Sequence, residues 1–292
     1  MTSAIAVGRR PASAGRAPVP GPLWLGWQLA LIGVLLALAA VAWAVTGLRM
    51  VGMDDGPGSD PGTLGFYVGT WVVMMAAMMF PSVAPTVTMF ARLQSGRRAK
   101  GMTAPAGAVA SFLSGYLVTW TAAGLVGYGL LQAGRALDGG ALAWDSGGRW
   151  AAVGVLAAAA LYEFTPLKDA CLTRCRGPLG FFMESWRDGR LGALRMGLAH
   201  GAWCVGCCWA LMAALFALGA MSIPWMIVIA ALIALEKLLP WRAVATYGVA
   251  TVLIALALGV AIAPSDVPGL TIPGHDMGMG MDTEMQTGMG SG

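Results

Sequence analysis

The sequence has few charged side chains. Asp, Glu, Lys and Arg make up 11% of its 292 residues, against about 25% in a typical soluble domain. Hydrophobic residues make up 58%, and several apolar runs reach about 20 residues, the length that crosses a bilayer. This composition excludes an ordinary soluble domain and predicts a protein with several membrane spans.

The sequence also lacks the motifs of several function classes. It has no Gly-x4-Gly-Lys-Ser/Thr loop, which argues against an ATP-driven pump. It has no local motif of a Ser–His–acid hydrolase and no basic run with interleaved aromatic residues, so we expect no nucleic-acid partner. The five cysteines are an odd number and lie in or beside apolar runs, which does not fit the disulfide framework of a secreted domain. Nothing here favours an enzyme.

The apolar runs predict an all-α, polytopic membrane helix bundle of about seven transmembrane helices. The sixth run is the least regular, because Glu236 and Lys237 interrupt it. The expected spans are residues 23–45, 66–91, 106–134, 149–167, 191–219, 222–239 and 243–263.

The basic residues indicate an orientation. Of the eighteen Lys and Arg, all but Arg49, Arg135 and Arg149 fall in the N-terminal arm or in the second–third, fourth–fifth and sixth–seventh connections. Basic residues concentrate on the cytoplasmic side of membrane proteins. The pattern therefore predicts seven spans with the N-terminus inside and the C-terminus outside.

Both ends of the chain differ from the apolar middle. Residues 1–22 read as a disordered basic arm, 23–263 as the transmembrane domain and 264–292 as a disordered, Met-rich extracytoplasmic tail. A disordered linker explains the glycines of this tail but not its repeated methionines. We expect a weak Cu(I) collector made of His275, Met277, Met279 and Met281.

One ten-residue stretch, His200 to Trp209, holds one of the two histidines and three of the cysteines. At about 100° per residue, Cys204, Cys207 and Cys208 lie roughly 40°, 20° and 80° from His200 around a helix. An imidazole and thiolates suit a soft metal such as Cu(I), zinc or an iron–sulfur cluster. The alternative is ordinary packing, because free cysteine also behaves as a small hydrophobic residue.

The second expected span contains two methionine pairs with four-residue spacing. Thioethers suit Cu(I), although methionine also fills irregular gaps between helices. Pro81 and Pro85 follow and are expected to break or bend this helix. The candidate ligands are Met74, Met75, Met78 and Met79.

Cys171 and Cys175 form a Cys-x3-Cys pair beside arginines, which lower the pKa of neighbouring thiols. The pair could hold a metal or act as a redox dithiol. We expect it on the cytoplasmic side of the His200–Cys208 stretch, where it would suit metal hand-over.

Four ionisable residues lie near the inner ends of spans, where an unpaired charge is expensive. Glu163 and Lys168 could form a structural ion pair or the mouth of a proton or metal path. For Glu236 and Lys237 we expect a mutually neutralising pair.

These segments resemble one bacterial family, catalogued as predicted metal-binding integral membrane proteins of uncharacterised function. The most specific part is His-Gly-x-x-Cys-x-Gly-Cys-Cys-Trp at 200–209, and the resemblance covers roughly 66 to 259. It implies a multispan protein of the bacterial cell (inner) membrane and a bound metal. The other matching segments are Trp71 to Ser82, Thr165 to Lys168 with Cys171, Cys175 and Pro178-Leu179, and Glu236-Lys237-Leu238.

The leading hypothesis is a membrane protein that imports, relays or inserts Cu(I), with zinc or iron as other possible metals. Its expected partners are the lipid bilayer, the metal ion, and a metallochaperone or a subunit of a membrane metalloenzyme. A membrane thiol–disulfide oxidoreductase and an accessory or assembly subunit of a larger metalloenzyme complex are the alternatives.

Overall fold

The computed structural model describes residues 22–50, 62–137, 144–220 and 222–270, and this part of the chain is all-helical, without a strand. The expected Met-rich collector around His275 and nearly all of the basic arm lie outside these residues. The predicted helical class is therefore confirmed, whereas the two terminal segments stay predictions.

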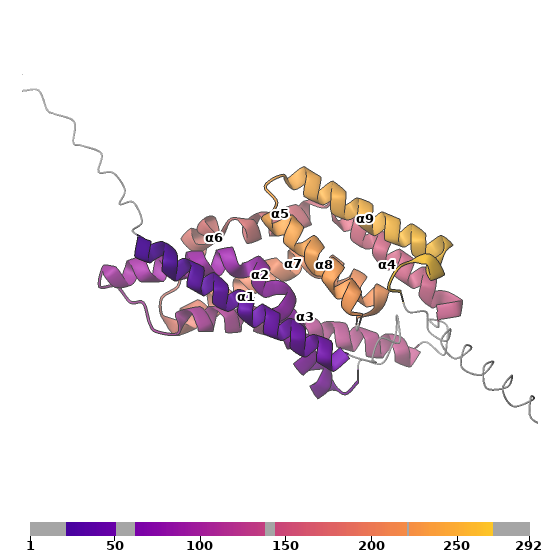
Figure 1. Cartoon of the computed structure of the whole chain (residues 1–292), viewed down its shortest axis with the longest axis horizontal. Coiled ribbons are helices and arrows are strands. Elements are labelled where there is room, and N and C mark those ends of the chain that lie inside the picture. Colours follow the sequence, from indigo (N-terminus) through magenta and orange to yellow (C-terminus); the bar gives the residue numbers. More distant parts are fainter. Residues whose placement is uncertain (1–21, 51–61, 138–143, 221, 271–292) are drawn as a thin grey trace, which may run out of the picture.

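The seven expected spans each correspond to a helix, and two short helices stand between the fourth and fifth. Figure 1 shows them as one elongated bundle. The helices are α1 (Pro22–Met50), α2 (Leu64–Ala99), α3 (Ala108–Leu137), α4 (Arg149–Tyr162), α5 (Pro166–Arg176), α6 (Pro178–Ser185), α7 (Gly189–Gly219), α8 (Ile223–Leu238) and α9 (Arg242–Ile262), with a π-helical turn at Trp144–Gly148 and a 3-10 turn at Pro264–Asp266.

Five of these helices are long and apolar enough to cross a membrane: α1, α2, α3, α7 and α9. Helices α4 and α5 pass the same test only as a pair, bent by 66° at the break between them. Helix α8 has 16 residues, about 24 Å at 1.5 Å per residue, which is less than the roughly 30 Å of a hydrocarbon core. The structure thus supports five or six spans by length, and seven spans with a fixed orientation remain a prediction.

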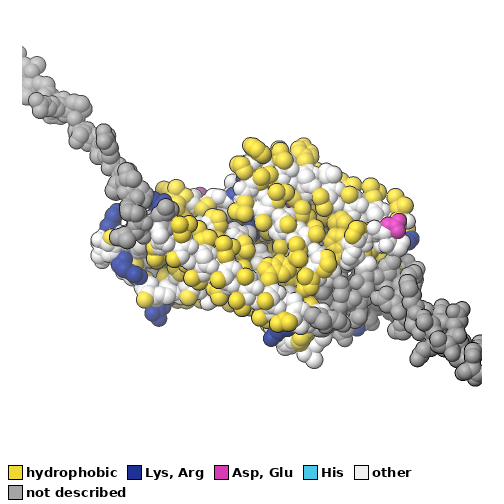
Figure 2. All heavy atoms as spheres, viewed as in Figure 1, with side chains coloured by type: hydrophobic (Ala, Val, Ile, Leu, Met, Phe, Trp, Pro, Cys, Tyr) yellow, Lys and Arg dark blue, Asp and Glu magenta, His cyan; other side chains and the backbone are white. Residues whose placement is uncertain are grey.

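The surface fits a protein surrounded by lipid. Apolar side chains cover most of the face seen in Figure 2, and Lys and Arg gather mainly at the end where α1 begins. Large hydrophobic side chains such as Val41, Leu130 and Ile262 are more than half exposed. An exposed apolar surface of this extent normally marks contact with lipid or another protein.

Helix α7 lies at the centre and packs against α3, α4, α5 and α8. Its contact with α3 depends on glycine: a Cβ on Gly197 would lie 2.0 Å from the carbonyl oxygen of Phe112, and one on Gly115 would lie 2.2 Å from that of Leu194. Small residues let two helix backbones approach this closely in membrane proteins. The close α3–α7 contact fixes the helix that carries most of the cysteines.

The bend between α4 and α5 follows from local sequence. Thr165 caps α5 by accepting a hydrogen bond from the Lys168 amide at 3.3 Å, and Pro166 occupies the first turn. Proline there starts a new helix but disfavours helical backbone in the residue before it. The Tyr162 hydroxyl donates to the Gly206 carbonyl at 2.6 Å, so the break lies beside the middle of α7.

The expected break at Pro81 and Pro85 does not occur, because α2 continues as one helix through both residues. Each proline removes one backbone donor. The Ser82 hydroxyl donates to the Met79 carbonyl at 2.9 Å, and the Thr88 hydroxyl donates to the Pro85 carbonyl at 2.9 Å. The carbonyls that lose a helical donor are those of Ala77 and Pro81, so these hydroxyl bonds are additional contacts within the helix and do not replace the missing ones.

Candidate metal site

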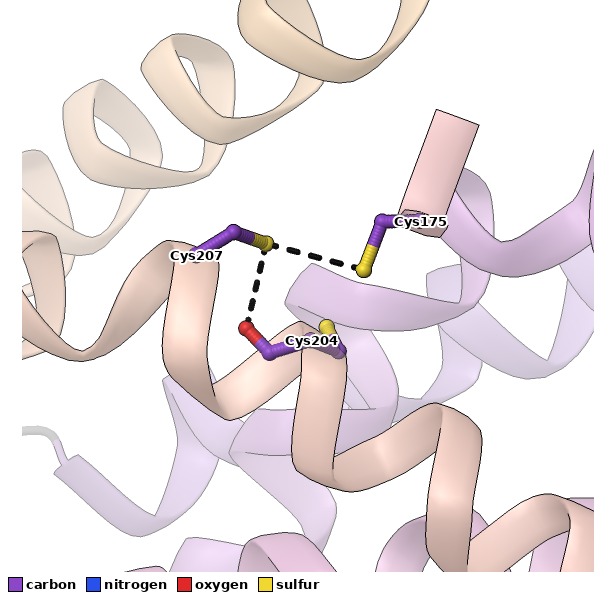
Figure 3. Close-up of side chains that lie close together, drawn as sticks. All are labelled: Cys175, Cys204 and Cys207. Carbon is purple, nitrogen blue, oxygen red and sulfur yellow. Dashed lines mark hydrogen bonds between the residues drawn. The ribbon is translucent and has the colours of Figure 1, made fainter. Parts of the chain in front are cut away.

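Three thiols from two helices meet at the interface of α5 and α7. The sulfur atoms of Cys175, Cys204 and Cys207 all lie within 4.8 Å of one another, and Cys175 Sγ is 3.7 Å from Cys207 Sγ. In Figure 3, Cys204 and Cys207 stand on one helix and the Cys175 side chain points towards them from another. We call these three residues the thiol cluster. Cys204 and Cys207 are each 1% exposed.

The spacing of the thiol cluster suits a metal ion. Three sulfurs bound to one ion at about 2.3 Å, the length of a zinc–thiolate bond, stand about 4 Å apart when they surround it in a plane. The Cys175–Cys207 separation of 3.7 Å is close to this value, and the other two separations are at most 4.8 Å. The cluster could therefore hold a soft ion by small side-chain movements.

The other two cysteines flank the thiol cluster. Cys208 Sγ lies 3.3 Å from Cys207 Sγ. Cys171 faces Gly206, where a Cβ would come within 2.7 Å of its sulfur. Glycine at 206 thus lets α5 lie against α7, which brings Cys175 to its partners. The sequence suggested a separate cytoplasmic Cys171/Cys175 pair, but the structure places both beside the α7 cysteines.

A partly buried cation contacts the thiol cluster. Lys237 Nζ lies 3.0 Å from Cys204 Sγ and 3.3 Å from Ser82 Oγ, and the Tyr116 hydroxyl lies 3.0 Å from the same sulfur. The ammonium of Lys237 therefore stands where it can balance negative charge on thiolates. Nothing in the sequence pattern indicated Tyr116 or Ser82, since neither belongs to a recognisable ligand motif.

The remaining ionisable residues form a second buried group, which we call the charge cluster. Lys168 forms ion pairs with Glu163 and with Glu236, the latter at 2.6 Å between Nζ and Oε1. All three side chains are at most 2% exposed. The expected pairing of Glu236 with Lys237 is wrong: adjacent helix residues point about 100° apart, so one reaches α5 and the other reaches α7.

His200 is close in sequence to the thiol cluster but does not belong to it. The group of mutually close ligand atoms found among the described residues does not include its imidazole. The ring is buried among Phe112, Tyr116 and Phe181, with centroid distances of 5.9, 6.2 and 5.2 Å. In the described part of the chain, its Nδ1 has no hydrogen-bond partner.

Four of the five methionines of α2 are buried in the core. They are Met74, Met75, Met78 and Met79, which we call the methionine ladder. Its end is near the thiol cluster, because Ser82 contacts both the Met79 carbonyl and Lys237. The backbone at the end of the methionine ladder is thus connected to Cys204 through one serine and one lysine.

The fold and the site define a class of protein: a helical bundle with apolar helices of membrane-spanning length and a buried thiol group that could bind a metal. A family model described as PpoB2, copper chaperone, matches residues 68–260, and the chain belongs to this family. No curated protein and no solved structure matches the chain. The family and the thiol cluster agree on a metal-handling protein.

Proposed function

We propose that this protein is a multispan protein of the bacterial cell membrane that binds Cu(I) at the thiol cluster and passes it to a partner. The observation that carries the proposal is the convergence of Cys175, Cys204 and Cys207 within 4.8 Å in a chain of the copper chaperone family. Copper is the cargo of such a protein.

The number and kind of ligands favour Cu(I) over zinc or iron. Structural zinc sites and iron–sulfur clusters usually have four protein ligands, whereas the thiol cluster offers three close sulfurs. Soft thiolates select Cu(I). A monovalent ion leaves negative charge on bound thiolates, and Lys237 is placed to balance it.

The route to the site would use the remaining soft ligands. With seven spans and the C-terminus outside, the tail residues His275, Met277, Met279 and Met281 would collect Cu(I) outside the membrane. The methionine ladder would then carry it towards Lys237 and the thiol cluster. A metallochaperone or a metalloenzyme subunit would receive it.

Elemental analysis tests the proposal. Protein purified from membranes under reducing conditions is compared with a Cys175→Ser/Cys204→Ser/Cys207→Ser variant and a Cys171→Ser control. We expect near-stoichiometric copper in the wild type and the control, and none in the triple variant. Absence of copper from the wild type would contradict the proposal, and zinc or iron in its place would retain the site but remove the copper route.

A thiol–disulfide oxidoreductase is the second candidate. It is favoured by the short distances from Cys207 Sγ to Cys208 Sγ, 3.3 Å, and to Cys175 Sγ, 3.7 Å. Mass-spectrometric counting of free thiols after oxidising and reducing preparation tests it. A count that does not change would eliminate this candidate.

A further inference from the structure

One face of α7 carries a row of potential metal ligands that runs from the thiol cluster towards the N-terminus of the helix. Met196, His200 and Cys204 are spaced by four residues, so each lies about 40° and about 6 Å along the axis from the next. The three side chains are 1%, 3% and 1% exposed. Thioether, imidazole and thiolate therefore follow one another along a buried line, which we call the α7 row.

His200 is the middle member of the α7 row and has an unused ligand atom. Its Nδ1 is buried and has no hydrogen-bond partner among the described residues. A buried polar atom left without a partner destabilises the fold, and the faces of the surrounding aromatic rings cannot satisfy it with a strong hydrogen bond. Imidazole nitrogen binds copper as well as zinc, so a transient metal ion would provide the missing partner.

Met196, at the N-terminal end of the α7 row, borders a surface cavity although its side chain is 1% exposed. It lines a cavity of about 580 Å³ together with Ala199, Trp186, Arg187 and Arg195. This cavity opens beside the first turns of α7, whose N-terminus is Gly189. Met196 is thus the member of the α7 row that borders this groove, whereas none of the three cysteines of the thiol cluster lines it.

We propose that Met196 and His200 form a second Cu(I) site, through which the ion passes between the thiol cluster and this groove. Each step replaces one metal–ligand bond by another, from Cys204 sulfur to His200 nitrogen and then to Met196 sulfur. Copper remains Cu(I) throughout, and the thiolate that Cys204 regains stays beside the Lys237 ammonium. The inference rests on the proposed function, because the thiol cluster supplies the ion.

The low histidine content permits a direct spectroscopic test. The chain has two histidines, so a His275→Gln background leaves His200 as the only imidazole. With 15N-labelled histidine, the first equivalent of Cu(I) should fill the thiol cluster, and the second should shift the Nδ1 resonance. Met196→Leu should raise the copper concentration needed for this shift by about tenfold. Loss of a residue that supports a metal site typically lowers metal affinity by about 10- to 100-fold, and we expect the lower value here.

Met212→Leu is the matched control, because Met212 is a buried methionine of the same helix outside the α7 row. It should behave as the parent protein does. Leucine has nearly the volume of methionine, so both substitutions should preserve folding. An Nδ1 resonance that does not move at two equivalents, with the thiol cluster loaded, would overturn the second site.

Release kinetics test the transfer step. Copper-loaded protein is reconstituted in vesicles and exposed to a membrane-impermeant Cu(I) chelator, bathocuproine disulfonate, on the side of the groove. Met196→Leu should retain the bound copper but release it about tenfold more slowly, whereas Met212→Leu should match the wild type. Equal rates would refute the transfer route while leaving the proposed function intact, and a wild type that never loads copper would overturn both.

Discussion

Helix α5 contributes to two buried polar groups, the charge cluster near its N-terminus and the thiol cluster near its C-terminus. The two groups differ in how their side chains are paired. At the N-terminal end, Lys168 joins two carboxylates, so each charge of the charge cluster has a partner. At the C-terminal end, Cys175 joins Cys204 and Cys207. These sulfurs lie close to one another and to the Lys237 ammonium, but within the described part of the chain they form no ion pair with an oppositely charged side chain of fixed geometry. Ion pairs from one lysine to two carboxylates tie helices together, whereas a loose group of thiols can still accept an ion. Under the proposed function, the charge cluster fastens the helices and the thiol cluster binds the metal.

The largest effect should come from breaking the charge cluster. Lys168→Met leaves Glu163 and Glu236 buried without their cation, and removal of one partner from a buried ion pair costs about 3–5 kcal/mol. We expect a large drop in the thermal unfolding midpoint in detergent, monitored by tryptophan fluorescence.

A neutral version of the same group is the control. The combined Glu163→Gln/Lys168→Met/Glu236→Gln variant removes all three charges and should recover much of the lost stability. Copper bound per folded chain should stay at the wild-type level in both variants. Loss of copper from a folded Lys168→Met protein would show that the charge cluster also takes part in binding.

Disrupting the thiol cluster should have the opposite pattern of effects: copper binding should fall while the stability of the metal-free protein changes little. In the wild type, Cu(I) at about 100 times its Kd should stabilise the fold by about 2.7 kcal/mol, because the ion binds only the native state. Cys204→Ser should abolish most of this copper-dependent stabilisation and change the metal-free unfolding midpoint little. Cys171→Ser is the control, and a copper response in Cys204→Ser equal to that of the control would contradict the assignment.

A smaller effect should follow from separating the two helices without changing any ligand. In Gly206→Ala the new methyl group would meet Cys171 Sγ at 2.7 Å, and such overpacking typically costs about 1–3 kcal/mol. We expect weaker copper binding in a competition titration.

The double variant Gly206→Ala/Cys171→Ala removes the clashing sulfur and should restore part of the affinity. A coupling energy between the two positions would show that they are in contact. If the two substitutions acted independently, the close approach of α5 and α7 at Gly206 would not control the site.

The smallest effect should come from the exposed ion pair of Asp169 with Arg242, one residue beyond Lys168 on α5. Both side chains are accessible to solvent, and exposed pairs contribute about 0.2–1 kcal/mol. Asp169→Asn should lower the unfolding midpoint slightly, by an amount that shrinks in high salt. A drop as large as that of Lys168→Met would remove the distinction between the buried and exposed pairs.

Helical periodicity placed Cys204 and Cys207 on one face of a helix, and their sulfurs do lie together, but it also grouped His200 with them, which lies outside the thiol cluster. It could not predict Cys175, whose position depends on the 66° bend after Tyr162 and on the missing side chain at Gly206. Both are tertiary features that no spacing within one helix reveals. For the same reason the sequence predicted two separate cysteine sites, whereas in the structure Cys175 belongs to the same group as Cys204 and Cys207.

The ionisable residues show where local reasoning fails. Glu236 and Lys237 are neighbours in sequence, and that proximity suggested a pair, but the helix directs them to different partners on α5 and α7. Hydropathy correctly found the apolar segments of the bundle. It did not foresee that α8 would be only 16 residues long or that α2 would continue through two prolines.

The burial of the thiol cluster has a consequence for the safety of the cell. Reduced copper that meets peroxide in water gives hydroxyl radicals, which damage lipid and protein at once. Cys204 and Cys207 are 1% exposed, and their helix is packed against α5. An ion held between them would therefore be shielded from oxidants dissolved in water. Under the proposed function, the same packing that encloses the ligands would keep bound copper from reacting with peroxide.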